Sequence, residues 1–186
     1  KARLLYVADN ADPLRKVYPF LDEGKYKELV GFPLAEIPAP KGDESYDQYF
    51  LRPFFEALER VGVYPEVVNN YQFYQEGKFE ECTKRIIDQT KTARKILETV
   101  SGRQLPKNWF PWTFKNNDGR LCTGKVTKYD WPYVTFENDN GEEVTNNMAK
   151  GEGKLPWRLD WPSKWKVLGV TFETFGKDSF VKLETN

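Results

Sequence analysis

The sequence predicts an α/β fold with a small antiparallel β insertion, and three observations support this. Short apolar runs suited to buried strands alternate with stretches of helical spacing through the first half of the chain. A lead rich in proline and tryptophan, beginning at residue 103, then opens a segment of strand-forming residues. Two pairs in that segment, Asp118-Gly119 and Asn140-Gly141, are the strongest hairpin signals that a sequence offers.

The first half of the chain carries the α/β pattern. The apolar run over residues 3–8 predicts a buried strand, and residues 63–68 predict a second one. Between them, apolar residues at helical spacing predict a helix from a cap at Asp43 or Ser45 to about Val61. Strands joined through a helix are expected to lie parallel.

Residues 78–100 predict the longest helix, with Gly102 as its stop. The buried stripe would be made by Phe79, Cys82, Ile86, Thr90, Ala93 and Leu97. The opposite face carries Lys84, Arg85, Lys91, Arg94 and Lys95. Such a face is either solvated or able to touch a phosphate backbone, and the sequence leaves both open.

Composition and turn signals divide the chain into three predicted domains. Residues 1–102 are the first part of the core, 103–153 are a β-rich inserted lobe, and 154–186 return to the core. The lobe is expected to hold three or four short antiparallel strands, and residues 170–175 predict a last core strand.

The chain is organised around residues 155–165, which place three tryptophans between two prolines. Because each proline disfavours helix in the residue before it, residues 157–161 are expected to be extended. Alternation would then put Trp157 on one side and Asp160 on the other. Pro162 would start a short helix whose stripe of Trp161, Trp165 and Leu168 faces a core. The stretch is either core packing beside a solvated ion pair, or a pocket wall where an aromatic face meets a buried carboxylate.

Polar residues directly follow the first predicted strand. In α/β folds the ligand crevice lies at the carboxyl ends of the strands, where Asp9, Asp12 and Arg15 are expected. The alternative is simple capping, because Asp12 followed by Pro13 is a good helix start.

Composition excludes some functions and leaves others open. Lys+Arg and Asp+Glu number 28 each, so no net field attracts nucleic acid or membrane, and RNA binding would need local patches. There is no histidine, which excludes a histidine base and any zinc site that needs one. Cys82 and Cys122 are expected to be thiols in a reducing compartment.

Localisation follows from the same features. No run of about 18 apolar residues suits a membrane span, and no signal peptide is seen. The chain begins at Lys1 without an initiator Met, which suggests an excerpt or a processed product. We expect the cytoplasm or an organelle interior and no membrane partner.

Several pieces of the chain resemble, in the same order, class I lysyl-tRNA synthetases. They are Asp9-Asn10-Ala11-Asp12-Pro13-Leu14-Arg15-Lys16-Val17, Glu44-Ser45-Tyr46, Leu105-Pro106-Lys107-Asn108-Trp109, Gly153-Lys154-Leu155-Pro156-Trp157-Arg158-Leu159-Asp160-Trp161-Pro162 and Phe175-Gly176-Lys177-Asp178. The resemblance runs from Arg3 to Ser179. It implies part of the Rossmann-type core of a class I aminoacyl-tRNA synthetase, with a zinc-ribbon-like lobe inserted. It also implies descent from an enzyme that joins lysine to its tRNA using ATP.

The resemblance also implies a substrate pocket. Trp157 would be an aromatic wall, with Asp160 and Asp178 as partners for a cationic ligand. Lys177 and Ser179 flank Asp178 in the pocket motif. Asp9, Asp12 and Arg15 would lie at the opposite strand end. No residue of this chain is assigned a catalytic role.

Departures from the family pattern argue against an active enzyme. The two ATP-binding signature loops would lie upstream of Lys1 and downstream of Asn186, and Ser179 stands where the family has a histidine. Losing such groups would remove transition-state stabilisation. The turns at 115–119 and 138–141 lack the paired cysteines of many relatives, so we expect a lobe without metal.

Two hypotheses follow. The first is a degenerate, non-catalytic module that binds tRNA, another structured RNA or a protein within an RNA–protein assembly, without a cofactor. The second is the middle portion of an active lysine–tRNA ligase that uses ATP. A soluble α+β domain with chance similarity is a third alternative.

Overall fold

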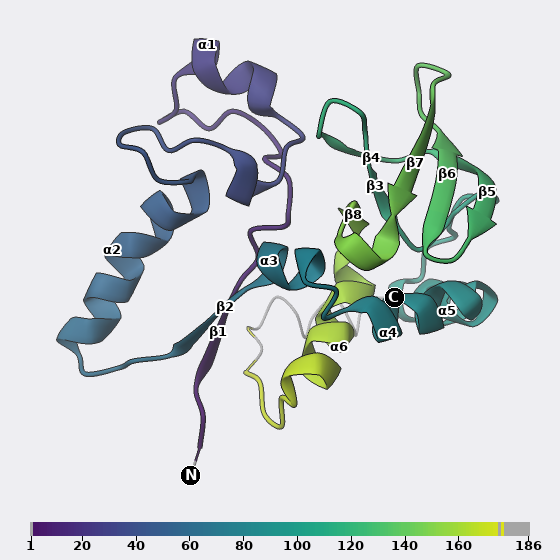
Figure 1. The fold of residues 1–186 in the computed structure, drawn as a ribbon. Helices are drawn as coiled ribbons and strands as arrows, with labels where there is room; N and C mark the ends of the chain where they lie inside the picture. The colour runs from purple at the N-terminus through teal and green to yellow at the C-terminus, as the bar shows by residue number, and fades with distance from the viewer. Residues whose placement is uncertain (1, 175, 177–186) are drawn as a thin grey trace. The chain divides into compact units, whose positions relative to one another are not determined.

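The computed structural model describes residues 2–174 and 176 (Figure 1). They belong to two compact units, one of residues 1–76 with 115–122 and one of residues 77–114 with 123–186. These units cut across the divisions expected at 102/103 and 153/154. The three domains were predicted from composition and turn signals, whereas the two units are defined by contacts between residues. The units therefore do not test the three domains, which stay a prediction.

The first unit is built on a parallel pair of strands. β1 (Leu5–Ala8) pairs with β2 (Glu66–Asn69) from Leu5↔Glu66 to Ala8↔Asn69. The chain between the two strands includes α2 (Tyr46–Arg60), which runs through Pro53 without a restart (Figure 1). The two strands, their parallel direction and the connecting helix are confirmed.

An aromatic and aliphatic cluster forms the core beside α2. Its buried members are Leu14, Leu21, Tyr26, Ile37 and Tyr46. Short helical turns surround it: α1 (Glu23–Tyr26), η1 (Lys27–Leu29) and η2 (Leu34–Glu36). α3 (Asn70–Gln75) follows β2 directly, and β4 (Leu121–Cys122) also belongs to this unit.

Two helices replace the single long helix predicted over residues 78–100. α4 (Glu80–Asp88) and α5 (Thr90–Ser101) separate at Gln89, whose φ of −109° and ψ of 30° leave the helical region. The predicted continuity was wrong because no residue in the sequence signals this local break. Gly102 takes a left-handed φ of 63° and ends α5, as predicted.

The β-rich segment forms an antiparallel sheet in the second unit. β5 (Lys125–Asp130) pairs with β6 (Tyr133–Glu137), which pairs with β7 (Glu143–Asn147) (Figure 1). Alternation buries Val134 and Phe136 completely, and the Phe136 ring stacks on Phe114 with centroids 4.2 Å apart. These inward side chains form the second core.

Three short elements adjoin this sheet. They are β3 (Thr113–Lys115), η3 (Met148–Lys150) and β8 (Gly153–Lys154). β3 and β8 pair antiparallel, with Thr113 opposite Lys154 and Phe114 opposite Gly153.

The organising stretch is a helix and not an extended segment. α6 (Trp157–Leu168) begins after Pro156 and continues through Pro162, so the extended geometry predicted for 157–161 was wrong. The expected core stripe was wrong too, since Trp165 is 36% exposed. The buried face consists of Leu159, Asp160, Ser163 and Lys164. Tertiary contacts of this polar face outweigh the local preference that the prolines impose.

Residues 170–174 form no strand, contrary to the expectation for 170–175, while Phe175 lies outside the described residues. No helix in the described part of the chain is both long enough and apolar enough to cross a membrane.

Candidate functional site

Asn10 is the centre of a buried polar cluster where β1 and β2 end. Its side-chain Nδ2 donates to Asp47 Oδ2 at 2.7 Å and to Asn69 Oδ1 at 3.1 Å. Its Oδ1 accepts from the backbone N–H of Tyr71 at 2.9 Å. Asn10 is 2% exposed, so one amide ties together the ends of both strands and the start of α2. Hydrogen bonds of this kind fix a buried polar group in one orientation.

A cavity of about 670 Å³ opens beside this cluster, between α2 and the two strands. Asn10, Asp47 and Asn69 line it, and the other oxygen of Asp47 accepts from Ser45 Oγ at 2.6 Å. A carboxylate held in this way can accept a hydrogen bond from a hydroxyl or an ammonium group. Its position outside the carboxyl ends of parallel strands is where α/β folds bind ligands.

The three residues predicted here lie close by but do not line this cavity. Asp9 is exposed, and Arg15 forms an ion pair with Asp12 at 3.5 Å, with the Arg15 side chain 73% exposed. The sequence reasoning therefore named neighbours of Asn10 at the end of the first strand but not Asn10 itself, and the place of Asp9, Asp12 and Arg15 in a substrate pocket stays a prediction. The polar pair Asn69-Asn70, at the end of the second predicted strand, is the sequence signal that could have indicated a polar partner for Asn10.

A second polar cluster in the first unit centres on Glu36. Its Oε1 accepts from Tyr71 Oη at 2.7 Å and from Lys115 Nζ at 2.5 Å. Burial, followed by the hydrogen bond to Glu36, raises the pKa of Tyr71 above its ordinary value. Tyr71 therefore stays protonated at neutral pH and acts as a donor.

In the second unit, Asp160 lies in a buried ion cluster. Its Oδ2 is 2.8 Å from Lys164 Nζ, one helical turn later, and 3.6 Å from Lys154 Nζ on β8. The three side chains are at most 9% exposed. Asp160 was predicted as a partner for a cationic ligand. The structure shows that its carboxylate already contacts two lysines.

Trp157, the predicted aromatic wall, is 53% exposed at the start of α6. Its ring lies 5.7 Å from that of Trp161, and the guanidinium of Arg158 lies 5.4 Å from its centroid. In the extended geometry that was predicted, Arg158 and Trp157 would lie on opposite sides of the chain. In the helix, the Arg158 guanidinium instead covers the Trp157 ring. The exposed indole retains surface for a further contact.

Lys177, Asp178 and Ser179, also predicted in the pocket, lie outside the described residues. The chain reaches their motif through Glu173. The indole Nε1 of Trp161 donates to Glu173 Oε2 at 2.9 Å, and that of Trp165 donates to the same oxygen. Glu173 was missed, since a lone glutamate carries no signal. These bonds hold Glu173 against α6.

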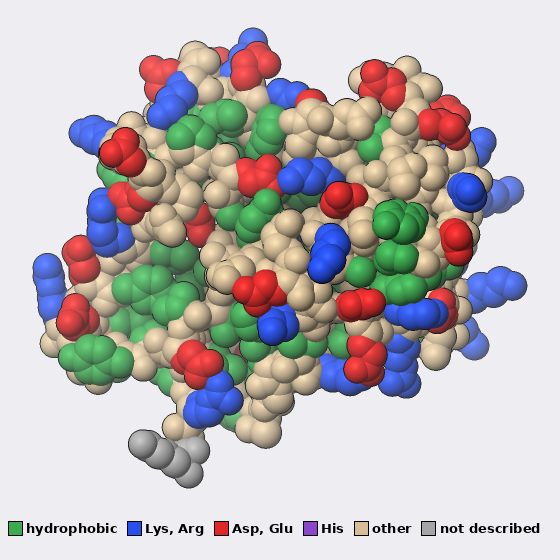
Figure 2. Space-filling model, viewed as in Figure 1, with side chains coloured by type: hydrophobic (Ala, Val, Ile, Leu, Met, Phe, Trp, Pro, Cys, Tyr) green, Lys and Arg blue, Asp and Glu red, His purple; other side chains and the backbone are tan. Residues whose placement is uncertain are grey.

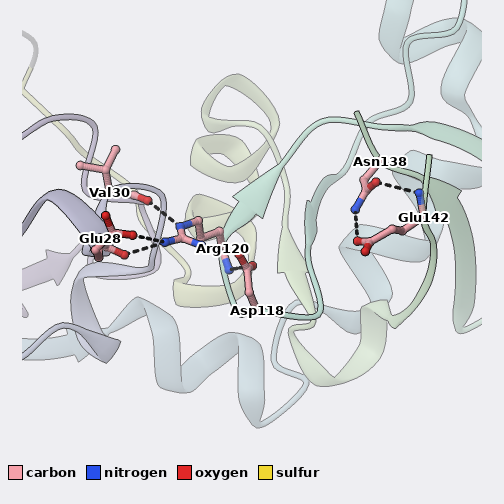
Figure 3. Close-up of polar contacts among 6 residues, drawn as sticks. All are labelled: Glu28, Val30, Asp118, Arg120, Asn138 and Glu142. Atoms are coloured by element: carbon pink, nitrogen blue, oxygen red, sulfur yellow. Dashed lines mark hydrogen bonds and ion pairs between the residues drawn. The ribbon is translucent and has the colours of Figure 1, made fainter. Parts of the chain in front are cut away.

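The two turns that lack cysteines are held by different contacts (Figure 3). In the first unit, Arg120 donates to the carbonyl oxygens of Val30 at 3.2 Å and Glu28 at 2.7 Å, and to the Asp118 carboxylate. Hydrogen bonding from the backbone and side chain of Arg120 lowers the pKa of Asp118 despite opposing desolvation. These contacts are enough to order that turn.

In the second unit, the side chain of Asn138 bridges the other turn (Figure 3). Its Oδ1 accepts from the backbone N–H groups of Asn140 and Glu142, each at 3.0 Å, and its Nδ2 donates to Glu142 Oε2 at 3.0 Å. This is the Asx-turn chemistry that asparagine favours. The absence of bound metal from this lobe stays a prediction.

The chain belongs to the class I lysyl-tRNA synthetases. The family model described as tRNA synthetases class I (K) matches residues 1–182. That range includes both compact units nearly to the end of the chain.

Individual relatives of the chain are named lysine–tRNA ligases. The chain is 47% identical over 181 residues to Lysine–tRNA ligase 1 of Methanosarcina acetivorans, covering 95% of this chain and 34% of that protein. It is 41% identical over 180 residues to Lysine–tRNA ligase of Archaeoglobus fulgidus, covering 96% of this chain and 36% of that protein. For Lysine–tRNA ligase of Methanocaldococcus jannaschii the identity is 40% over 183 residues, with 96% and 34% covered.

The chain therefore spans about a third of the length of these relatives. The matches favour the second hypothesis, a portion of a ligase, over the degenerate module that was the main expectation. Nothing in them shows a non-catalytic role.

Proposed function

We propose that this chain is part of the catalytic core of a lysine–tRNA ligase, which uses ATP to join lysine to tRNA. The observation that carries the proposal is the family match over residues 1–182. Because the match extends through both compact units, it does not rest on a single short motif.

The first unit supports a Rossmann-type assignment. Such cores are built from parallel strands joined through a helix, and β1, α2 and β2 form one such unit. The Asn10–Asp47 cluster lies at the carboxyl end of the strands, where this fold class binds its ligands. We assign the adjacent cavity to the substrate side of the ligase.

The second unit supports a role in lysine binding. Trp157 offers an exposed indole face, and an ammonium group over such a face gains about 0.5–2 kcal/mol. Asp160 contacts two lysines of its own unit, and the resemblance implies Asp178 as a carboxylate for the ammonium of lysine. tRNA is the proposed partner, and ATP the proposed co-substrate.

Lysine-dependent exchange of pyrophosphate into ATP tests the proposal on a purified protein that contains this chain together with the two ATP-binding loops, which the resemblance places outside residues 1–186. We expect exchange with lysine and none with arginine. Trp157→Ala should raise the KM for lysine about tenfold with little change in kcat, because it removes about 1.4 kcal/mol of binding.

Trp109→Phe is the matched control, because Trp109 is a half-buried tryptophan outside α6. Its KM for lysine should stay within twofold of the parent. A folded protein without any lysine-dependent exchange would favour the non-catalytic module, to which Ser179 and the cysteine-free turns point.

A further inference from the structure

Three helices of the second unit line a groove that does not include Trp157. α4, α5 and α6 each present one stripe to it, and its volume is about 390 Å³. This lies within the range of small-molecule sites. The apolar floor includes Ile86, Leu97, Leu159 and Pro162.

The rim of the groove is basic. Arg85 from α4 and Arg158 and Lys166 from α6 line it, and none of the described residues that line it is an aspartate or a glutamate. Lys166 is engaged by Glu81 at 2.8 Å. Neither guanidinium forms an ion pair or hydrogen bond within the described part of the chain, although Arg158 covers the Trp157 ring. Two arginine forks thus lie over one apolar floor, with the Glu81 carboxylate close enough for its charge to act on Arg85.

Uncharged polar side chains complete the lining. Gln89, between α4 and α5, and Thr92 on α5 contribute an amide and a hydroxyl. A fatty acid would need an anion site and an apolar floor but no amide. A nucleoside phosphate uses all three features: forks for the phosphate, aliphatic side chains for the faces of the base, and polar groups for its edges.

We infer that the groove between α4, α5 and α6 binds a nucleoside phosphate through Arg85 and Arg158. The ligand comes either from a single-stranded end of RNA or from a free nucleotide, since the two share this chemistry. The inference does not depend on ligase activity, because it concerns binding alone.

Binding of AMP by titration calorimetry, and of a labelled single-stranded RNA pentanucleotide by fluorescence anisotropy, tests the inference. We expect Arg85→Gln and Arg158→Gln each to weaken binding about tenfold, which is typical of a lost charged hydrogen bond. The affinity of Arg85→Lys should lie between those of the parent and of Arg85→Gln, because lysine keeps the positive charge but lacks the forked guanidinium. Tighter binding of the RNA identifies a strand end, and equal affinity identifies a free nucleotide.

Lys91→Gln is the matched control, because Lys91 is an exposed cation of α5 outside the groove. It should leave both affinities within twofold. Equal binding of adenosine and AMP, equal weakening by Lys91→Gln, or no binding of either probe would overturn the inference. Circular dichroism and thermal melts establish that each variant is folded. Loss of pyrophosphate exchange with this binding intact would leave the inference standing while removing the proposed function.

Discussion

At the scale of the residue, Asp160 shows how burial changes the role of a charged group. A carboxylate that is 1% exposed pays a large desolvation cost, which only close cations can offset. Lys164 meets it within one helical turn, and Lys154 meets it from β8. Asp160 therefore joins α6 to the strand beside it.

Replacing Asp160 with Asn should lower the free energy of unfolding by roughly 3–5 kcal/mol. The amide occupies the same space but removes the negative charge that both ammonium groups contact. Urea denaturation at neutral pH measures the loss. Asp139→Asn, on an exposed turn, should change it by less than about 0.5 kcal/mol. Equal stability of the two variants would show that the cluster contributes nothing.

At the scale of the element, the pairing of β3 with β8 depends on one glycine. Gly153 has a φ of 111°, a region that side chains rarely enter. A Cβ there would lie 2.3 Å from the Thr113 carbonyl oxygen and 2.4 Å from Trp112 Nε1. The close approach lets the strand that carries Lys154 pass beside β3.

Gly153→Ala should destabilise the protein by more than about 3 kcal/mol, since backbone and a buried tryptophan must both move. Gly141→Ala is the control, because Gly141 has a similar φ of 79° but nothing within 4 Å of the added carbon. It should cost about 1 kcal/mol, the conformational strain alone. Thermal melts compare the two, and similar costs would refute the steric argument.

At the scale of the whole molecule, acidic and basic side chains are equal in number. The formal net charge is zero, and acidic and basic side chains are interspersed on the face drawn in Figure 2. Recognition of an anionic partner must therefore come from local groups, such as the two arginines of the groove.

Metal content is a second property of the whole chain. The described residues hold no group of three or more cysteine, aspartate or glutamate side chains placed to bind a metal ion. We predict well under one zinc per chain by elemental analysis, and a melting temperature unchanged by EDTA. One zinc per chain, or a melt lowered by the chelator, would refute this.

The sequence alone predicted the elements whose signals are local. The first two strands, α2 between them and the turn at Asn140-Gly141 follow from apolar spacing and turn chemistry over a few neighbouring residues. The family could also be identified, because its motifs are read directly from residue identity. The pairing of Asn10 with Asp47 could not, since 37 residues separate them.

Only the tertiary structure decided the conformation of residues 157–168 and the neighbours of their charges. Proline preferences act between adjacent residues and favoured an extended chain. The contact of Asp160 with Lys164 lies within one turn of α6, whereas its contact with Lys154 exists only when β8 lies beside α6, and burial strengthens both. The contact with Lys154 joins two separate elements, and a sequence read for local preferences does not contain it.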